Sequence, residues 1–219
     1  MRAVCGMVIM DVVEGEGRSS KTFPETPAGQ GQTPPVSPDP ERGVAAGEIS
    51  REEALAIAKG NLATVVRACD ELGYSDLTLC PETMGKINQL GNLEEVLELC
   101  TVDERLLPCV DFGHLYARSL GELEGRAACA QMLDRMEAVL GEERASGFHS
   151  HFSKIEFTLK GGEKRHLCFS DPGYGPDFRP LAEEVARRGW EPWIICESAG
   201  TQSEDALTMK KIYQEVCRP

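Results

Sequence analysis

Short apolar runs alternate with longer stretches of helical periodicity along most of the chain. Four of these runs predict strands, at residues 77–80, 106–110, 148–157 and 192–196. The intervening stretches predict helices. Strands that alternate with helices are typical of βαβ units and a parallel sheet, so we predict an α/β fold.

The predicted helices carry recognisable start and stop signals. "SREE" is a capping box, with Ser50 as N-cap and Glu53 three residues later, and Gly73 is the expected end of that helix. Asn92 is expected to cap a short helix over Leu93–Cys100. Further helices are predicted within residues 122–140, over 178–188, and from a cap at Ser203 to about residue 216.

The first 48 residues have a different composition. Residues 1–13 are apolar enough to predict one strand, whereas residues 14–48 are rich in Pro, Gly, Ser and Glu. Such a segment buries too little apolar surface to offset the entropy of ordering. We therefore predict a largely disordered segment over 1–48 and a partial β/α barrel domain over 49–219.

Charge and cysteine content narrow the functional classes. The net charge of −13 disfavours nonspecific binding to nucleic acid, although it permits a local basic groove or bound cations. The nine cysteines form no CxxC pair and several lie in apolar runs, which predicts a reducing, cytoplasmic compartment. No run approaches the ~18 apolar residues of a membrane span, so no membrane partner is expected.

Candidate metal ligands follow or end the predicted strands. They are Glu82, Asp111, His114, His149, His151, His166 and Glu197. His149 and His151 are two apart on one strand, so both side chains project to the same face. Parallel strands bring their carboxyl ends to one rim, as in a β/α barrel. Mixed imidazole and carboxylate ligands suit zinc or manganese better than calcium or magnesium.

Five segments together resemble a known family. They are "LTLCPETMGKINQLGNLEEVLELC", "LLPCVDFGHLYAR", "FHSHFSKIEF", "EKRHLCFSDPGYGPDFRPLAE" and "IICESAGTQSEDALTMKKIY". In this order they resemble the C-terminal half of the endonuclease IV family, the apurinic/apyrimidinic endonucleases of the xylose-isomerase-like barrels. The resemblance covers roughly residues 50–215. It implies a TIM barrel, here incomplete with about four to five parallel strands instead of eight.

The resemblance also implies an activity and roles for individual residues. The family cleaves the phosphodiester on the 5′ side of abasic sites in DNA with three zinc ions. Glu82 resembles the glutamate that bridges two metals, and Glu82 or Glu197 is expected to be the catalytic carboxylate. The remaining counterparts are Asp111 and His114 for the Asp-x-x-His pair, His151 or His149 for the next strand, His166 for the following loop, and Glu197 for the last strand.

The chain departs from the family pattern in two places. The family has Asp two positions before the loop histidine, where this chain has Lys164 with Glu163 beside it. The family also takes two histidines from earlier strands, but no histidine precedes His114. These departures predict a truncated barrel whose cleavage activity is impaired.

The loop before His166 is locally basic. Lys160, Lys164 and Arg165 are therefore candidates for contact with the DNA backbone, and a solvated loop tip is the alternative interpretation.

Two other functions fit the same residues. A sugar isomerase or epimerase of the same superfamily would need one metal, held by Glu82, Asp111, His151 and Glu197. A non-catalytic truncated barrel is the other alternative. In every case the two outer strands of an incomplete apolar sheet lack neighbours, so self-association through the exposed edges is expected.

Overall fold

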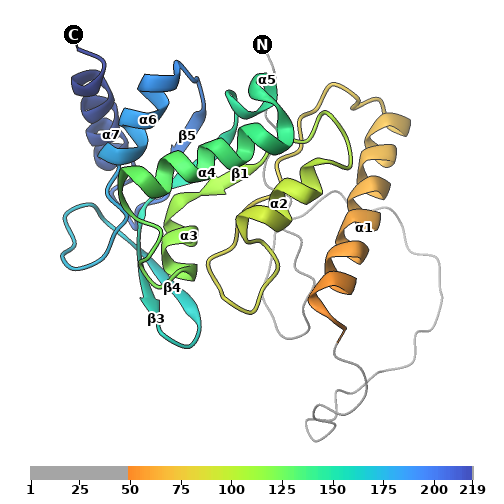
Figure 1. The fold of residues 1–219 in the computed structure, drawn as a ribbon, viewed down its shortest axis with the longest axis horizontal. Helices are drawn as coiled ribbons and strands as arrows, with labels where there is room; N and C mark the ends of the chain where they lie inside the picture. Colours follow the sequence, from red (N-terminus) through yellow and green to blue (C-terminus); the bar gives the residue numbers. More distant parts are fainter. Residues whose placement is uncertain (1–48, 219) are drawn as a thin grey trace, which may run out of the picture.

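The computed structural model of this chain describes residues 49–218, which form a mixed α/β fold with parallel strands (Figure 1). The strand predicted at residues 1–13 and the disorder predicted at 14–48 lie outside the described residues. Within them, no helix has both the length and the apolar character of a membrane span.

The first two helices begin where their capping signals predict. Helix α1 spans Arg51–Glu71, and the Ser50 hydroxyl accepts a 3.1 Å hydrogen bond from the Glu53 N–H. The Glu53 carboxylate in turn accepts one from the Ser50 N–H at 2.8 Å, which completes the capping box. Helix α2 spans Leu93–Cys100 and has a second capping box, formed by Asn92 and Glu95.

Three strands form a parallel sheet in the order β1-β2-β5. They are β1 (Cys109–Asp111), β2 (His149–Phe152) and β5 (Trp193–Cys196). Residues around Leu79 and Glu82 lie along β1 through isolated parallel bridges to Leu106 and Cys109. Within residues 49–218, this arrangement is an incomplete barrel with four parallel segments.

The strand predicted at 77–80 is wrong as a continuous strand, and the one at 106–110 is shortened. The N–H groups of Leu107 and Cys109 donate to the carbonyls of Leu79 and Pro81. Thr83 then returns a hydrogen bond to the Cys109 carbonyl at 3.0 Å. Pro81, two residues before Thr83, has no N–H with which to continue that alternation, so the ladder is interrupted.

The strand predicted at 148–157 is in fact two strands with different partners. Strand β2 ends at Phe152, and β3 (Lys154–Thr158) leaves the sheet to pair antiparallel with β4 (Gly162–Leu167). The prediction of a loop around His166 is therefore wrong, because His166 lies in β4. Gly162 has φ 74°, a conformation that glycine adopts without strain, and it starts the returning strand.

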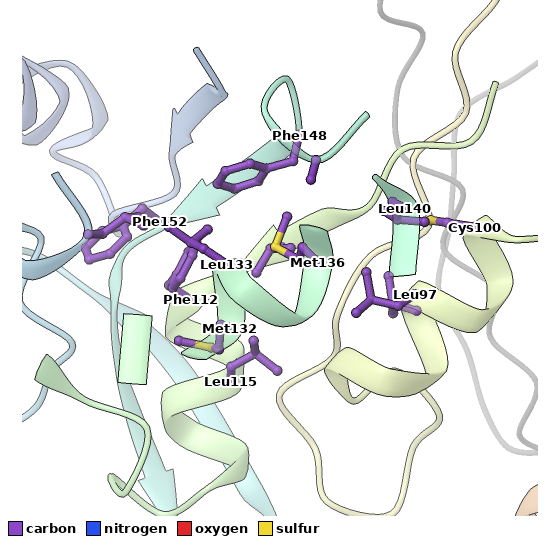
Figure 2. Packing of buried hydrophobic residues seen from close by; sticks show 14 of the residues in the cluster. Leu97, Cys100, Phe112, Leu115, Met132, Leu133, Met136, Leu140, Phe148 and Phe152 are labelled. Carbon is purple, nitrogen blue, oxygen red and sulfur yellow. The ribbon is translucent and has the colours of Figure 1, made fainter. Parts of the chain in front are cut away.

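Helices cover one face of the sheet and enclose the core (Figure 1). Besides α1 and α2, which contribute residues to the core, they are α3 (Phe112–Arg118), α4 (Gly125–Leu140), α5 (Glu142–Ala145), α6 (Arg179–Arg188) and α7 (Gln202–Val216). Figure 2 shows Phe112 of α3 packed with Phe148, Phe152 and Leu133. Ser203 does not cap the last helix as predicted, because the N-cap is Thr201, two residues earlier, and Ser203 lies inside α7.

The opposite face of the sheet is the one that a closed barrel would enclose. Asp111, His151 and Ile195 are register partners across the three strands and share this face. Trp193 and Ile195 on it are 68% and 49% exposed. The described part of the chain therefore leaves an apolar margin uncovered beside the polar rim.

Candidate metal centre

Asp111 connects the sheet to the helix that follows it. It is the last residue of β1 and the N-cap of α3, and its Oδ1 accepts a 2.8 Å hydrogen bond from the His114 N–H. The residue is fully buried, and within residues 49–218 its Oδ2 has no hydrogen-bond partner. A buried carboxylate oxygen without a partner is costly unless a cation compensates it. The unpartnered Oδ2 of Asp111 is therefore a candidate metal ligand.

Four strand ends bring ligand atoms together around Asp111. Glu82 Oε1 and Glu197 Oε1 lie 2.9 and 3.1 Å from His151 Nδ1. One ligand atom each from Glu82, Asp111, His151 and Glu197 lies within 4.8 Å of the others, and we call this set the first ligand group. The convergence expected for parallel strand ends is therefore present.

A second ligand group adjoins the first and consists of His114, Glu163 and His166. His114 Nδ1 donates to the Thr83 carbonyl at 2.8 Å, so the proton is on Nδ1 and Nε2 is free. That Nε2 lies 3.6 Å from Glu163 Oε2. His166 Nδ1 forms a 2.8 Å hydrogen bond with the Ser153 hydroxyl, which orients the imidazole ring.

The two groups meet at two carboxylates of the first. Glu82 Oε1 is 3.8 Å from His114 Nδ1, and Glu197 Oε2 is 4.0 Å from His166 Nε2. Ligands for two neighbouring cations are thus available on one rim.

Glu163 is the candidate ligand that sequence reasoning missed. Glu163 and His166 are three residues apart, so on a regular strand their side chains would project to opposite faces. The hairpin has a register shift between Glu156, which pairs with Arg165, and Phe157, which pairs with Glu163. Lys164 is therefore an extra, unpaired residue on β4. Such a bulge re-aims side chains, and here it brings Glu163 to the face of His166. The sequence offered one signal for this ligand, because Glu163 is an acidic residue directly before Lys164, close to the position where the family has Asp.

His149 lies beside the first group and not among its carboxylates. Its Nε2 is 3.3 Å from His151 Nε2, and its buried Nδ1 has no hydrogen-bond partner within residues 49–218. Burial and the neighbouring His151 lower the pKa of His149. Cys109 Sγ lies within 4.8 Å of a ring nitrogen of each of these histidines, but burial, Glu82 and Asp111 raise the pKa of the Cys109 thiol. The neutral thiol is a poor ligand.

The rim carries surplus negative charge. Burial alone would lower the pKa of His151, but Glu82, Glu197 and Asp111 outweigh it and the pKa is raised. Burial, with Asp111 and Glu82, also raises the pKa of Glu197. His151 and Glu197 thus hold protons more firmly than usual, and a bound cation would compensate the same negative charge in their place. Because ligands must lose protons to bind metal, affinity is expected to rise with pH.

The basic residues predicted to contact DNA lie on the hairpin, outside both ligand groups. Lys164 and Arg165 each form a 2.6 Å ion pair with Glu156, on the face opposite His166. Lys160 lies in the turn between β3 and β4.

A parallel α/β sheet whose strand ends carry histidines and carboxylates is typical of β/α barrels, and its candidate ligand groups lie at one rim, where such barrels place their active sites. The chain belongs to the xylose isomerase-like TIM barrel family, whose model matches residues 36–215. This family includes both sugar isomerases and endonuclease IV.

The chain is also similar to a protein from another organism. An uncharacterized protein from Methanocaldococcus jannaschii is 34% identical over 167 residues, which cover 76% of this chain and 59% of that protein. The chain therefore spans less than two thirds of the length of this relative.

Proposed function

We propose that the chain is a metal-dependent phosphodiesterase of the endonuclease IV type, acting on DNA at abasic sites. The observation that supports this best is the presence of two adjoining ligand groups, linked through Glu82 and Glu197. Paired cations that clamp the attacking and leaving oxygens are typical of phosphodiester hydrolysis. A single-metal isomerase would use the first group alone.

The donor set fits zinc, with manganese as the second choice. Glu82, Asp111, His151 and Glu197 would hold one ion, and His114, Glu163 and His166 the other. The bound ions would supply positive charge for the developing oxyanion and a lowered pKa for water.

The chain's own residues would position and deprotonate the attacking water. Glu82 is buried at the junction of the two groups, whereas the Glu197 side chain is 30% exposed. We assign Glu197 to accept the proton from water, because substrate can reach it, and Glu82 to hold the groups together.

Lys160, Lys164 and Arg165 are proposed to approach the DNA backbone. Lys160 lies in the turn of the hairpin that carries His166, and Lys164 and Arg165 lie on its opposite face, so a duplex would reach them by extending from the rim past the hairpin. Since the net charge is −13, affinity would depend on these few local contacts and would fall steeply with salt.

The direct test is cleavage of a duplex oligonucleotide that contains one abasic site, with the intact duplex as control. Zinc-loaded protein should cut only the abasic strand, more slowly than an enzyme that also has the two earlier histidines. Glu197→Gln should reduce the rate at least about hundredfold. Glu215→Gln should leave the rate unchanged, because Glu215 is an exposed carboxylate of α7 that pairs with Arg179 of α6.

A sugar isomerase or epimerase is the second candidate. The specific observation in its favour is that the first ligand group alone offers four ligands and needs no histidine from elsewhere. Interconversion of aldoses and ketoses by the metal-loaded protein, without cleavage of abasic DNA, would select this candidate over the endonuclease.

A further inference from the structure

The loop of residues 83–91, which follows Glu82, is bonded to the β3–β4 hairpin. The Glu163 N–H donates to the Gly85 carbonyl at 3.0 Å, and the Ile87 N–H donates to the Gly161 carbonyl at 3.3 Å. An antiparallel bridge joins Lys86 to Gly162 between them. The position of Glu163 therefore depends on the position of this loop.

The contact is close enough to involve the Glu163 side chain. A Cβ placed on Gly85 would lie 2.6 Å from the Glu163 Cβ and 2.7 Å from its Oε2. Real Cβ atoms do not come so near other heavy atoms. Glycine at position 85 thus lets the loop backbone lie directly against the carboxylate of the second ligand group.

Arg118, the last residue of α3, anchors this loop through hydrogen bonds from its side chain to the backbone of the loop. Its guanidinium donates four hydrogen bonds, to the carbonyls of Met84 at 3.2 Å, Lys86 at 2.8 Å, Ile87 at 3.0 Å and Gln89 at 2.9 Å. A planar guanidinium with several fixed N–H donors suits such a set of acceptors, whereas a lysine ammonium offers three donors at one point.

Helix α3 contacts the loop at a second place, one turn earlier. His114, four residues before Arg118, donates from Nδ1 to the Thr83 carbonyl. Residues four apart lie on the same face of a helix, so this face of α3 carries both a ligand and the group that holds the loop. The loop in turn places Glu163 opposite His114.

We infer that Arg118 is a positioning residue for the second ligand group, acting through the loop of residues 83–91 and Glu163. This inference rests on the proposed metal-dependent function, since it concerns the second cation of that site. The hydrogen bonds of Arg118 go to backbone carbonyls of the loop and not to the side chains of either ligand group. Without its hydrogen bonds the loop would shift, and Glu163 would no longer face the free Nε2 of His114.

Arg144 of α5 provides a matched control. Its Nη2 also donates to backbone carbonyls, those of Cys100 at 2.7 Å, Asp103 at 3.3 Å and Leu106 at 2.6 Å, but outside both ligand groups. Loss of either arginine should reduce stability. Only loss of Arg118 should change the second zinc.

The test is a zinc titration by calorimetry of wild type, Arg118→Lys and Arg144→Lys. Wild type is expected to bind two zinc ions. In Arg118→Lys the tighter ion should bind as before and the weaker one about ten- to hundredfold less tightly, as for other residues that orient ligands. Arg144→Lys should bind both ions as wild type does. Equal affinities in wild type and Arg118→Lys, or equal losses in the two variants, would overturn the inference.

Two further measurements cover misfolding and separate this inference from the proposed function. In metal-free protein, hydrogen exchange at the Glu163 and Ile87 amides should be faster in Arg118→Lys than in Arg144→Lys; equal rates would count against the inference.

Gly85→Ala displaces Glu163 while Arg118 stays in place, so it should also weaken binding of the second zinc ion, and unchanged affinity would contradict the loop's role. Wild type that binds two zinc ions with the Arg118 effect, but does not cut abasic DNA, would refute the endonuclease and leave this inference standing.

Discussion

The two ligand groups of the rim are built from different kinds of structure. The first group extends from parallel strands whose other face is packed against the helical core, and its members are 9% exposed or less except Glu197. The second group combines a helix residue, His114, with two residues of an antiparallel hairpin. Its geometry depends on the bulge at Lys164, on the close approach of Gly85 and Gly162, and on polar contacts to the loop of residues 83–91.

This difference has a consequence for metal binding. Ladder hydrogen bonds and buried side chains position the first group, so little ordering is needed when an ion arrives. The second group depends on polar contacts of which several are exposed or only partly buried, and such contacts contribute less each. We therefore expect the first group to bind zinc more tightly, and the second to be lost more readily on mutation.

The largest effect is expected for Asp111→Asn in the first group. The amide keeps the N-cap to His114 but removes the charge of the unpartnered oxygen, so zinc affinity there should fall more than about hundredfold. Wild type should be stabilised by about 4 kcal/mol at a zinc concentration a thousand times Kd, and the variant hardly at all. Thermal melts with zinc and with chelator measure this.

Asp134→Asn is the control for that experiment, because its carboxylate is exposed on α4 and pairs with Arg188. It should keep the full zinc response. Equal zinc stabilisation of wild type and Asp111→Asn would remove the first group as a metal site.

A smaller and more selective effect is expected for Glu163→Gln in the second group. The weaker zinc should bind about ten- to hundredfold less tightly while the tighter one is unchanged. Glu156→Gln is the matched control, since Glu156 lies on the same hairpin and pairs with Lys164 and Arg165 on its other face. If both variants weakened zinc alike, hairpin stability and not ligation would be the cause.

Glu184 in the helical layer tests a region independent of both groups. Hydrogen bonds from Arg187 lower the pKa of Glu184 to about 2, against the opposing effect of burial and together with Arg126. A lowered folded-state pKa contributes stability that is present above the unfolded value of about 4.5 and is lost as the pH falls towards 2. Glu184→Gln should cost about 1–3 kcal/mol at pH 7.

That difference between wild type and Glu184→Gln should shrink towards zero between pH 5 and about pH 2, and it should not respond to zinc. Chemical denaturation across this pH range, with chelator present, measures it. A difference that stays constant with pH would show that the ion pairs do not cause the stability.

The smallest effect concerns the uncovered edge of the sheet. Trp193 at the start of β5 is 68% exposed, and we propose that the isolated chain self-associates there or is only marginally stable. Trp193→Ser should weaken self-association about tenfold. Leu159→Ser, at an exposed apolar residue of the hairpin turn, should not. Light scattering with a thermal melt distinguishes these results from a stable monomer, which would contradict the proposal.

Much of the fold follows from local signals in the chain. Ser50 and Asn92 begin their helices as predicted, because a capping side chain satisfies N–H groups within its own turn. The first ligand group was also predictable, since parallel strands align their carboxyl ends whatever lies between them. The error at Leu79 arose from Pro81. The sequence shows that Pro81 has no N–H, but it does not show that this N–H would be needed for the pairing with the next strand.

Residue order alone determined the α/β class, the starts of α1 and α2, and the set of strand-end ligands, because these depend on interactions within a few residues or on the polarity of parallel strands. Tertiary structure decided that His166 lies on a strand, that a bulge turns Glu163 towards it, and that His151 rather than His149 lies among the carboxylates. These outcomes depend on which strands pair and in what register. Pairing is set by packing between residues far apart in the chain, so a local pattern cannot specify it.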